Sequence, residues 1–280
     1  MRFLASTLVQ WRPRQLIWGV RPDLKAHGVT FMSASDSPRS SDFFDSAYGE
    51  TPPWDIGEAQ PDLIALFNEY PPAGPVLDLG CGTGDLALAL ARRGLTVLGI
   101  DLAEAAIHQA RAKAAAVADV GRLTEFRVGD ALHPAQFPGP FGSVVDSGFF
   151  HLFGPLDRER LARELAATLA DGGRYYLVGF AFDSPIPNAP RQVREAELRA
   201  LFTPEHGWRV LALRPARLLI RSTWLWSQEA GHKAATLAQA MAKTDDANAL
   251  AGLAQGLAAL AACGNDVPGI AACVERVPLG

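Results

Sequence analysis

The stretch that decides the fold is Val76-Leu77-Asp78-Leu79-Gly80-Cys81-Gly82-Thr83-Gly84-Asp85. It begins as a short apolar run that ends in an acid, continues as glycines that alternate with small residues, and leads into a helical segment rich in Ala and Leu. Strand, glycine turn and helix in this order place the glycines where a ligand can approach the backbone. The N–H groups that open the following helix carry partial positive charge and favour a carboxylate or a phosphate.

The glycine turn is compatible with two kinds of nucleotide ligand. The residues from Gly82 to Ala87 read G-x-G-x-x-A, the fingerprint of dinucleotide-binding proteins. Asp78 at the strand end and Asp85 at the helix start would repel a pyrophosphate, whereas they suit a ligand with a positive amino group and no phosphate. Asp101 ends the next predicted strand, where its carboxylate can accept hydrogen bonds from ribose hydroxyls of either ligand.

Together with the run Gly129-Asp130-Ala131, these motifs resemble the class I S-adenosylmethionine-dependent methyltransferases over roughly residues 43–220. The resemblance implies an α/β fold with a Rossmann-like, doubly wound, seven-stranded and mostly parallel sheet. It implies S-adenosylmethionine as the cofactor and S-adenosylhomocysteine as its product. Cofactor contacts implied in this way are Asp78, Gly80, Gly82 and Gly84 for the methionine part, Asp101 and Leu102 for the ribose, and Asp130 and Ala131 for the adenine. An Asp before a turn can also be a simple cap, which is the alternative for Asp130.

The segment that follows the fourth predicted strand, residues 146–151, supplies the next candidates. The carboxyl ends of parallel strands form the ligand crevice of such sheets, so this segment emerges beside the transferable methyl group. In the family that the chain resembles, backbone carbonyls here receive the cofactor's amino group, which assigns Asp146 and Ser147 to the cofactor. His151 can accept a proton near neutral pH and is the candidate catalytic general base, with packing beneath the site as the alternative. The expected pocket walls are Phe149 and Phe150.

Two proline-rich segments are expected to border the site. The string Pro-Pro-Trp-Asp-Ile-Gly at residues 52–57 resembles methyltransferase branches that act on thiopurines, halides and quinones, in which this segment closes over the cofactor. The resemblance implies a cation–π contact between Trp54 and the sulfonium, with plain packing on the sheet as the alternative, and it assigns Tyr48 to the acceptor. Arg191 ends a proline-rich loop after the fifth predicted strand, and is either a ligand for a substrate carboxylate or phenolate, or a surface cation.

Composition narrows the classes of partner. The formal net charge of −4 over 280 residues does not favour nucleic acid or an anionic membrane. Three scattered cysteines show neither a disulfide framework nor a metal-binding spacing, which fits a reducing cytoplasm. No apolar run reaches the ~18 residues of a membrane span. The sequence therefore predicts a cytoplasmic monomer or homodimer without a metal, whose partner is a small-molecule acceptor.

Two parts of the chain depart from a minimal domain of this kind. Residues 1–41 are basic and lack periodicity, so they are expected to form a flexible leader ahead of a methyltransferase domain at 42–280. A basic amphipathic targeting segment is the alternative, and translation that starts at Met32 is a further hypothesis. Residues 222–268 are predicted to be a helical insertion before the last strand, either a lid or an oligomer contact.

The predicted activity is methyl transfer to a small acceptor, by O- or S-methylation of a phenol, quinone, thiol or similar group. A sulfonium is already an activated donor, so the protein need only align the reacting atoms and exclude water. One alternative is an NAD-dependent oxidoreductase that uses the same glycine turn. The other is a protein that binds S-adenosylmethionine without transferring its methyl group.

Overall fold

The computed structural model describes residues 40–181, 191–221 and 266–278. All of them belong to one compact unit, Asp36–Gly280. The predicted leader therefore lies outside the described residues except for its last two positions, of which the second, Ser41, begins α1. The predicted insertion also lies outside them except for residues 266–268, which already belong to the last strand.

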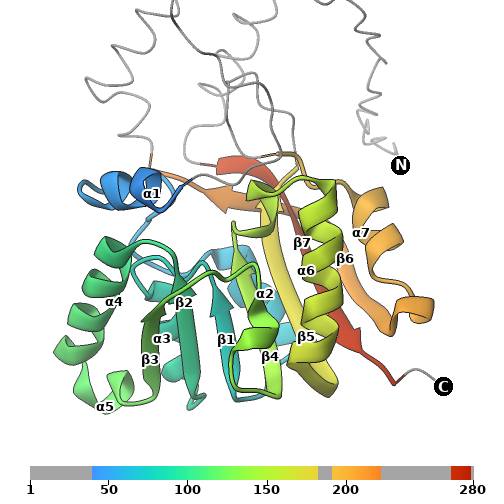
Figure 1. The fold of residues 1–280 in the computed structure, drawn as a ribbon, viewed down its shortest axis with the longest axis horizontal. Coiled ribbons are helices and arrows are strands. Elements are labelled where there is room, and N and C mark those ends of the chain that lie inside the picture. The colour runs from blue at the N-terminus through green and yellow to red at the C-terminus, as the bar shows by residue number, and fades with distance from the viewer. Residues whose placement is uncertain (1–39, 182–190, 222–265, 279–280) are drawn as a thin grey trace, which may run out of the picture. The chain divides into compact units, whose positions relative to one another are not determined.

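A seven-stranded sheet with the strand order β3-β2-β1-β4-β5-β7-β6 forms the centre of the described unit (Figure 1). β7 is antiparallel to β5 and β6, and the other neighbouring pairs are parallel. This arrangement confirms the predicted doubly wound, mostly parallel α/β fold. The strands are β1 Val76–Leu79, β2 Val97–Asp101, β3 Thr124–Val128, β4 Phe141–Ser147, β5 Leu169–Phe180, β6 Trp208–Leu219 and β7 Asp266–Arg276.

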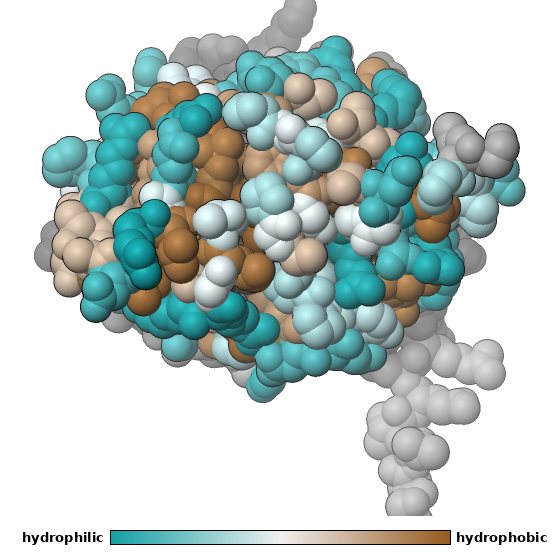
Figure 2. Space-filling model, turned by 90° about the horizontal axis from the view of Figure 1, so that it is seen from below, coloured by the Kyte–Doolittle hydropathy of each residue, from teal (hydrophilic) through white to brown (hydrophobic). Residues whose placement is uncertain are grey.

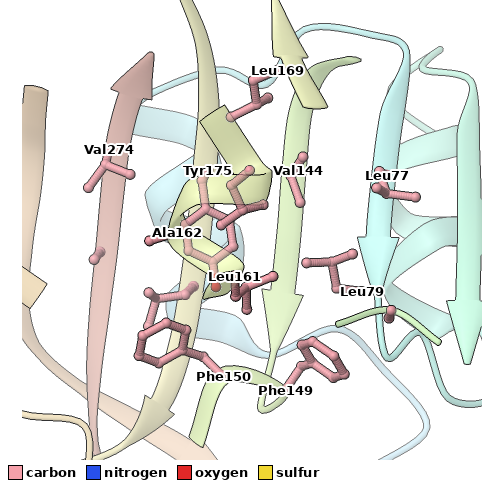
Figure 3. Packing of buried hydrophobic residues seen from close by; sticks show 14 of the residues in the cluster. Leu77, Leu79, Val144, Phe149, Phe150, Leu161, Ala162, Leu169, Tyr175 and Val274 are labelled. Carbon is pink, nitrogen blue, oxygen red and sulfur yellow. The ribbon is translucent and has the colours of Figure 1, made fainter. Parts of the chain in front are cut away.

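Helices cover both faces of the sheet, because successive residues of each buried strand point to opposite sides. Val76 packs in the cluster that includes α2, α3 and α4, whereas its neighbour Leu77 packs in the cluster that includes α6 and α7 (Figure 3). The α-helices are α1 Ser41–Tyr48, α2 Pro61–Glu69, α3 Asp85–Ala91, α4 Glu104–Ala116, α5 Ala118–Gly121, α6 Pro155–Thr168 and α7 Glu195–Leu201. Short 3-10 turns are η1 Pro134–Gln136, η2 Phe150–Leu152 and η3 Pro204–His206.

The last two strands are long, and β6 runs through a proline. β6 covers Trp208–Leu219, and β7 covers Asp266–Arg276. A proline normally argues against a strand because it has no N–H to donate. Pro215 is tolerated because β6 is the edge strand, where one side of the backbone has no partner strand.

The chain reverses its direction of strand addition between β1 and β4, which lie side by side although β2 and β3 separate them in sequence. Ligands of open α/β sheets bind at such a switch point, beyond the carboxyl ends of the strands. The opposite end of the sheet, where the parallel strands begin, shows apolar side chains mixed with polar ones (Figure 2). Within the described ranges, no helix is both long and apolar enough to cross a membrane.

Candidate active site

The glycine turn between β1 and α3 requires glycine for two reasons. Gly80 and Gly82 have φ angles of 63° and 52°, in the left-handed region that side chains disfavour. A Cβ atom on Gly80 would lie 2.8 Å from the ring of Phe149, and one on Gly82 would lie 2.8 Å from the hydroxyl of Tyr48. The turn is therefore enclosed on two sides, and its backbone is accessible only through the space that the missing side chains leave.

Asp78 is a buried acid at the end of β1. Asp78 is 1% exposed, and its Oδ2 atom accepts no hydrogen bond from the described residues. Burial, with the nearby carboxyls of Asp146 and Asp101, raises the pKa of Asp78 well above its ordinary value. A buried carboxylate without a donor is unfavourable, so a ligand ammonium group would stabilise it. The site thus fits the amino group of the methionine part of the cofactor.

Asp101 connects the end of β2 to the glycine turn. Its Oδ2 atom accepts the Gly82 N–H at 2.9 Å, and its Oδ1 atom accepts the Ala103 N–H at 2.9 Å. Burial raises the pKa of this carboxyl, and the two backbone donors act in the opposite direction. Each oxygen retains one acceptor position, which is the requirement for binding two ribose hydroxyls. Leu102, beside it, is half-buried.

Asp85 was expected to repel a pyrophosphate, but its charge is paired with a lysine. Its Oδ2 atom lies 2.7 Å from the ammonium group of Lys113, which also donates to the Thr83 hydroxyl at 2.7 Å. The Thr83 hydroxyl in turn lies 2.9 Å from Oδ2 of Asp55. The charge of Asp85 is thus largely compensated by the protein itself. We therefore expect Asp78 to contribute more than Asp85 to selection against a phosphate.

The N-terminal segment lies over the glycine turn. Tyr48 is buried, and its hydroxyl accepts the indole N–H of Trp54 at 3.0 Å. Burial is the main cause that raises the pKa of Tyr48, so its hydroxyl keeps its proton. Arg221, beyond the end of β6, donates from its backbone N–H to the Pro53 carbonyl at 2.8 Å and from its side chain to the Asp55 carbonyl. Trp54 is 37% exposed and stays beside Tyr48 instead of packing into the sheet.

A small pocket, partly open to solvent, lies between this segment and the turn. It brings together six of the residues predicted from sequence: Tyr48, Trp54, Asp78, Gly80, Gly82 and Ser147. The sequence did not indicate several other lining residues, among them Asp55, Gln60 and Thr83. Asp55 could have been found from its place as a polar residue in the proline-containing segment that resembles a cofactor cover. Gln60 gave no such signal, because its role is to pair with the backbone of Leu219 at 2.8 and 2.9 Å.

The residues predicted to contact the adenine, Asp130 and Ala131, lie in a turn. Oδ1 of Asp130 accepts the Leu132 N–H at 2.9 Å, which is the cap that the alternative interpretation describes. Its other oxygen lies 3.8 Å from Nε2 of His133, and the Asp130 side chain is half-exposed. Ala131 is buried. The adenine contacts of Asp130 and Ala131 stay predictions, and this second oxygen of Asp130 is the atom available for them.

Asp146 supports the loop after β4 through its carboxylate. The two oxygens accept the N–H of Phe149 at 2.7 Å, the N–H of Phe150 at 2.8 Å and the hydroxyl of Tyr175 at 2.7 Å. Burial raises the pKa of Asp146 to about 6 in spite of these donors. Its side chain is fully occupied within the protein, so the cofactor contact predicted for Asp146 would come from its backbone carbonyl.

Phe149 and Phe150 both belong to the core. Phe149 is 8% exposed and packs edge-on against Phe153, with ring centroids 4.7 Å apart. Phe150 is 1% exposed, and its ring lies under the guanidinium of Arg158 at 4.9 Å. Figure 3 shows both rings in the cluster at the end of the sheet where Leu79 lies. The Phe150 side chain is therefore part of the core packing.

His151 is buried beneath the same loop. Its ring stacks on Phe180 with centroids 4.6 Å apart, and its Nδ1 atom accepts the Phe180 N–H at 3.2 Å. A backbone N–H can only donate, so the neutral ring carries its proton on Nε2. His151 can therefore serve as a base only after Nδ1 releases this N–H. The backbone N–H of Arg191 donates to the His151 carbonyl at 2.8 Å, so the exposed Arg191 lies next to His151, and its contact with the acceptor stays a prediction.

In the part of the chain that the structure describes, no group of three or more His, Cys, Asp and Glu residues is arranged to hold a metal ion. Cys81, in the glycine turn, is a buried free thiol. Burial raises the pKa of this thiol, so it remains protonated and unreactive.

Comparisons with known proteins agree with this geometry. A family model described as a methyltransferase domain matches residues 76–173. The 2-heptyl-1-hydroxyquinolin-4(1H)-one methyltransferase of Mycobacteroides abscessus is 36% identical over 187 residues, which are 63% of this chain and 81% of that protein. A probable thiol methyltransferase of Arabidopsis thaliana is 27% identical over 155 residues, 54% of this chain and 67% of its own length.

Solved structures show the same likeness. A structure from work on the conversion of a disulfide bond into a thioacetal group during echinomycin biosynthesis has a TM-score of 0.60 and 25% identity, over 85% of this chain and 92% of that one. The glycine turn and the acids at the ends of β1 and β2 lie within the strand–turn–helix order that the sequence predicts, and the sheet is mostly parallel as the resemblance implies. The chain belongs to the class I S-adenosylmethionine-dependent methyltransferases.

Proposed function

We propose that this methyltransferase methylates an oxygen atom of a hydroxylated aromatic heterocycle. The observation that carries the cofactor half of the proposal is the buried Asp78 carboxylate, whose Oδ2 atom has no donor among the described residues. The acceptor half is supported by the relative with 36% identity, which acts on 2-heptyl-1-hydroxyquinolin-4(1H)-one. An aromatic N-hydroxy compound is within the phenol-like class that the sequence predicts.

The chain's own residues would hold the cofactor at the carboxyl ends of β1, β2 and β4. When bound there, S-adenosylmethionine supplies a methyl group on a positively charged sulfur atom, which an acceptor oxygen takes by direct displacement. Tyr48 and Trp54 would cover it and exclude water. The proposed contacts are Asp78, Gly80, Gly82 and Gly84 with the methionine part, Asp101 and Leu102 with the ribose, Asp130 and Ala131 with the adenine, and the backbone of Asp146 and Ser147 with the amino group.

The acceptor would lie beside Ser147, on the side of Phe149, His151 and Arg191. An N-hydroxy or phenolic acceptor becomes a nucleophile when it loses its proton, which would pass to the solvent before the acceptor is enclosed. We assign to His151 a hydrogen bond from Nε2 to the resulting oxyanion, because Nδ1 is already occupied by the Phe180 N–H. A donor aimed at a negative oxygen favours its ionised form and aligns it for attack. Arg191 would add a positive charge at the rim of the same space.

An acceptor panel tests the proposal. Purified protein is incubated with S-adenosylmethionine and either 2-heptyl-1-hydroxyquinolin-4(1H)-one, thiophenol or iodide, and methylated products are quantified by mass spectrometry. We expect the hydroxyquinolone to give the largest kcat/KM. S-methylation is the second candidate, favoured by the likeness to the thiol methyltransferase of Arabidopsis thaliana. Turnover of thiophenol alone would establish S-methylation and refute the proposed oxygen acceptor.

A further inference from the structure

Arg158, in the first turns of α6, is a buried cation that the cofactor site does not use. Its side chain is 3% exposed. Nε donates to the Phe150 carbonyl at 3.2 Å, Nη1 donates to the Gln192 carbonyl at 3.1 Å and to Oε2 of Glu197 at 2.6 Å, and Nη2 lies 3.4 Å from the Arg191 carbonyl. One guanidinium therefore joins η2, the segment at residues 191–192 and α7.

The joined segments are those that border the proposed acceptor space. η2 contains His151, whose carbonyl accepts the Arg191 N–H at 2.8 Å. The next residues close onto the end of β5, where the Val193 N–H donates to the Phe180 carbonyl at 2.7 Å. The same Phe180 donates its own N–H to Nδ1 of His151 at 3.2 Å. Arg158 thus fixes, from the core side, the backbone that determines where the His151 ring lies.

Buried opposite charges hold the peptide groups on both sides of Phe150. The Asp146 carboxylate accepts the Phe150 N–H at 2.8 Å, and Arg158 donates to the Phe150 carbonyl at 3.2 Å. A guanidinium can serve several acceptors at once because its donors form a rigid planar fork, whereas a lysine ammonium cannot span the same set. Replacement of Arg158 would leave the half-buried carboxylate of Glu197 without this partner and would release three backbone carbonyls.

We propose that Arg158 is a positioning residue for the acceptor half of the reaction: it orients His151 and the backbone at residues 191–193, and it does not contact the cofactor half. The inference rests on the proposed acceptor side, although its structural part can be tested without any acceptor. We predict that replacement of Arg158 weakens acceptor binding and slows turnover, whereas the affinity for S-adenosylhomocysteine stays the same.

The experiment uses the full chain with Arg158→Lys and Arg158→Met, and with Arg276→Lys as the matched control. Arg276 is also an arginine that donates to backbone carbonyls, those of Ala166 in α6 and Gly207, but it lies at the opposite end of the sheet. Three measurements are made: KM and kcat with 2-heptyl-1-hydroxyquinolin-4(1H)-one, Kd for S-adenosylhomocysteine by calorimetry, and hydrogen–deuterium exchange. Thermal stability is recorded for each variant.

For both Arg158 variants we expect the acceptor KM to rise roughly tenfold or more, and Kd for S-adenosylhomocysteine to change less than about threefold. Exchange should accelerate in peptides that cover residues 147–153 and 191–195, and should stay as in the wild type at the glycine turn. Arg276→Lys should lower thermal stability without a rise in acceptor KM. If exchange is unchanged in both peptides, or if cofactor and acceptor binding fall by the same factor, Arg158 has no positioning role.

The failure of this inference can be told apart from the failure of the proposed acceptor. If the wild-type protein does not methylate the hydroxyquinolone, the acceptor is wrong, and hydrogen–deuterium exchange with the cofactor titration decides on Arg158. Local acceleration near residues 150 and 191 with an intact affinity for S-adenosylhomocysteine then supports the positioning role. Exchange that accelerates throughout the domain overturns it, because Arg158 would then support only general stability.

Discussion

The substitution Asp78→Asn tests two effects of this carboxylate, which should strengthen ligand binding and should destabilise the folded protein without ligand. The substitution keeps the shape of the side chain and removes its charge. Oδ2 of Asp78 is buried and has no hydrogen-bond donor among the described residues, so in the free protein the charge is poorly stabilised. In the complex the same oxygen would receive an ammonium group. Binding should therefore weaken in the variant while the free protein becomes more stable.

The size of the binding effect follows from the kind of bond that is lost. A hydrogen bond that involves a charged group contributes about 1.5–3 kcal/mol, which corresponds to a rise of roughly 10- to 150-fold in Kd for S-adenosylhomocysteine. Calorimetric titration of wild type and Asp78→Asn measures it directly. The free Asp78 has a raised pKa and a bound ammonium group would lower that pKa, so binding to the wild type near the free pKa should also release protons.

The stability effect depends on pH in a defined direction. Because burial raises the pKa of Asp78 in the folded state, the folded protein holds this proton more tightly than the unfolded chain does. The group's contribution to stability is complete below the unfolded pKa, about 3.9, and is lost as pH rises through the folded pKa. Asparagine does not titrate, so the variant does not lose this stability as pH rises. The Tm of Asp78→Asn minus that of the wild type should therefore increase from pH 5 to pH 8.

Asp85→Asn supplies the contrast for stability. Asp85 is paired with Lys113 at 2.7 Å, so its neutralisation removes a favourable contact and should lower the Tm. Scanning fluorimetry without ligand at both pH values measures all of these differences. The reasoning about Asp78 is refuted if Asp78→Asn binds S-adenosylhomocysteine as tightly as the wild type, or if its Tm advantage is absent at pH 8.

Three further predictions address the turn, the histidine and the second buried acid. Gly82→Ala should weaken S-adenosylhomocysteine binding by roughly tenfold or more, because its Cβ would lie 2.8 Å from the Tyr48 hydroxyl. The control Gly172→Ala also has a positive φ, 77°, but its Cβ would meet nothing within 4 Å. It should therefore lower stability by about 1–2 kcal/mol and leave the affinity unchanged. Equal affinity losses in the two variants would contradict this. His151→Gln, which keeps a donor, should retain more kcat/KM than His151→Phe; equal losses with disappearance of the acidic limb of the pH–rate profile would indicate a general base instead. Tyr175→Phe should raise the pKa of Asp146 above about 6, measured by carbon NMR of the carboxyl group, since it removes a hydroxyl donor to the carboxylate; a lower pKa would contradict the hydrogen bond at 2.7 Å.

The parts of the site that the sequence predicts are those whose geometry is local. Asp78 and the glycines lie within one strand–turn–helix unit, so their order along the chain is enough to place them together. Asp101 also follows from order, because it ends the strand that pairs with β1. Parallel pairing brings the carboxyl ends of consecutive strands to one edge of the sheet. No knowledge of side-chain packing is needed for these residues.

The parts that the sequence did not predict depend on how helices pack. Asp85 is neutralised by Lys113, which is far along the chain on α4, and only the packing of that helix brings the two together. Arg158 looks like one of several charged residues of α6. It is buried because α7 supplies Glu197 and because η2 supplies a carbonyl beside it. Periodicity assigns a face to each helix, but it does not say which polar residue of that face meets a partner.

The three buried acids at this end of the sheet show why the site should select a cation. Burial raises the pKa of all three, but they differ in the number of hydrogen bonds that they accept. Asp146 accepts three hydrogen bonds, and Asp101 accepts one on each oxygen. Oδ2 of Asp78 accepts none among the described residues. A pyrophosphate would add negative charge next to the acid that is least stabilised, whereas an amino group would supply its missing donor. Discrimination between the two cofactor classes is therefore expected to reside in the partnerless oxygen of Asp78 and not in the glycines, which either ligand requires.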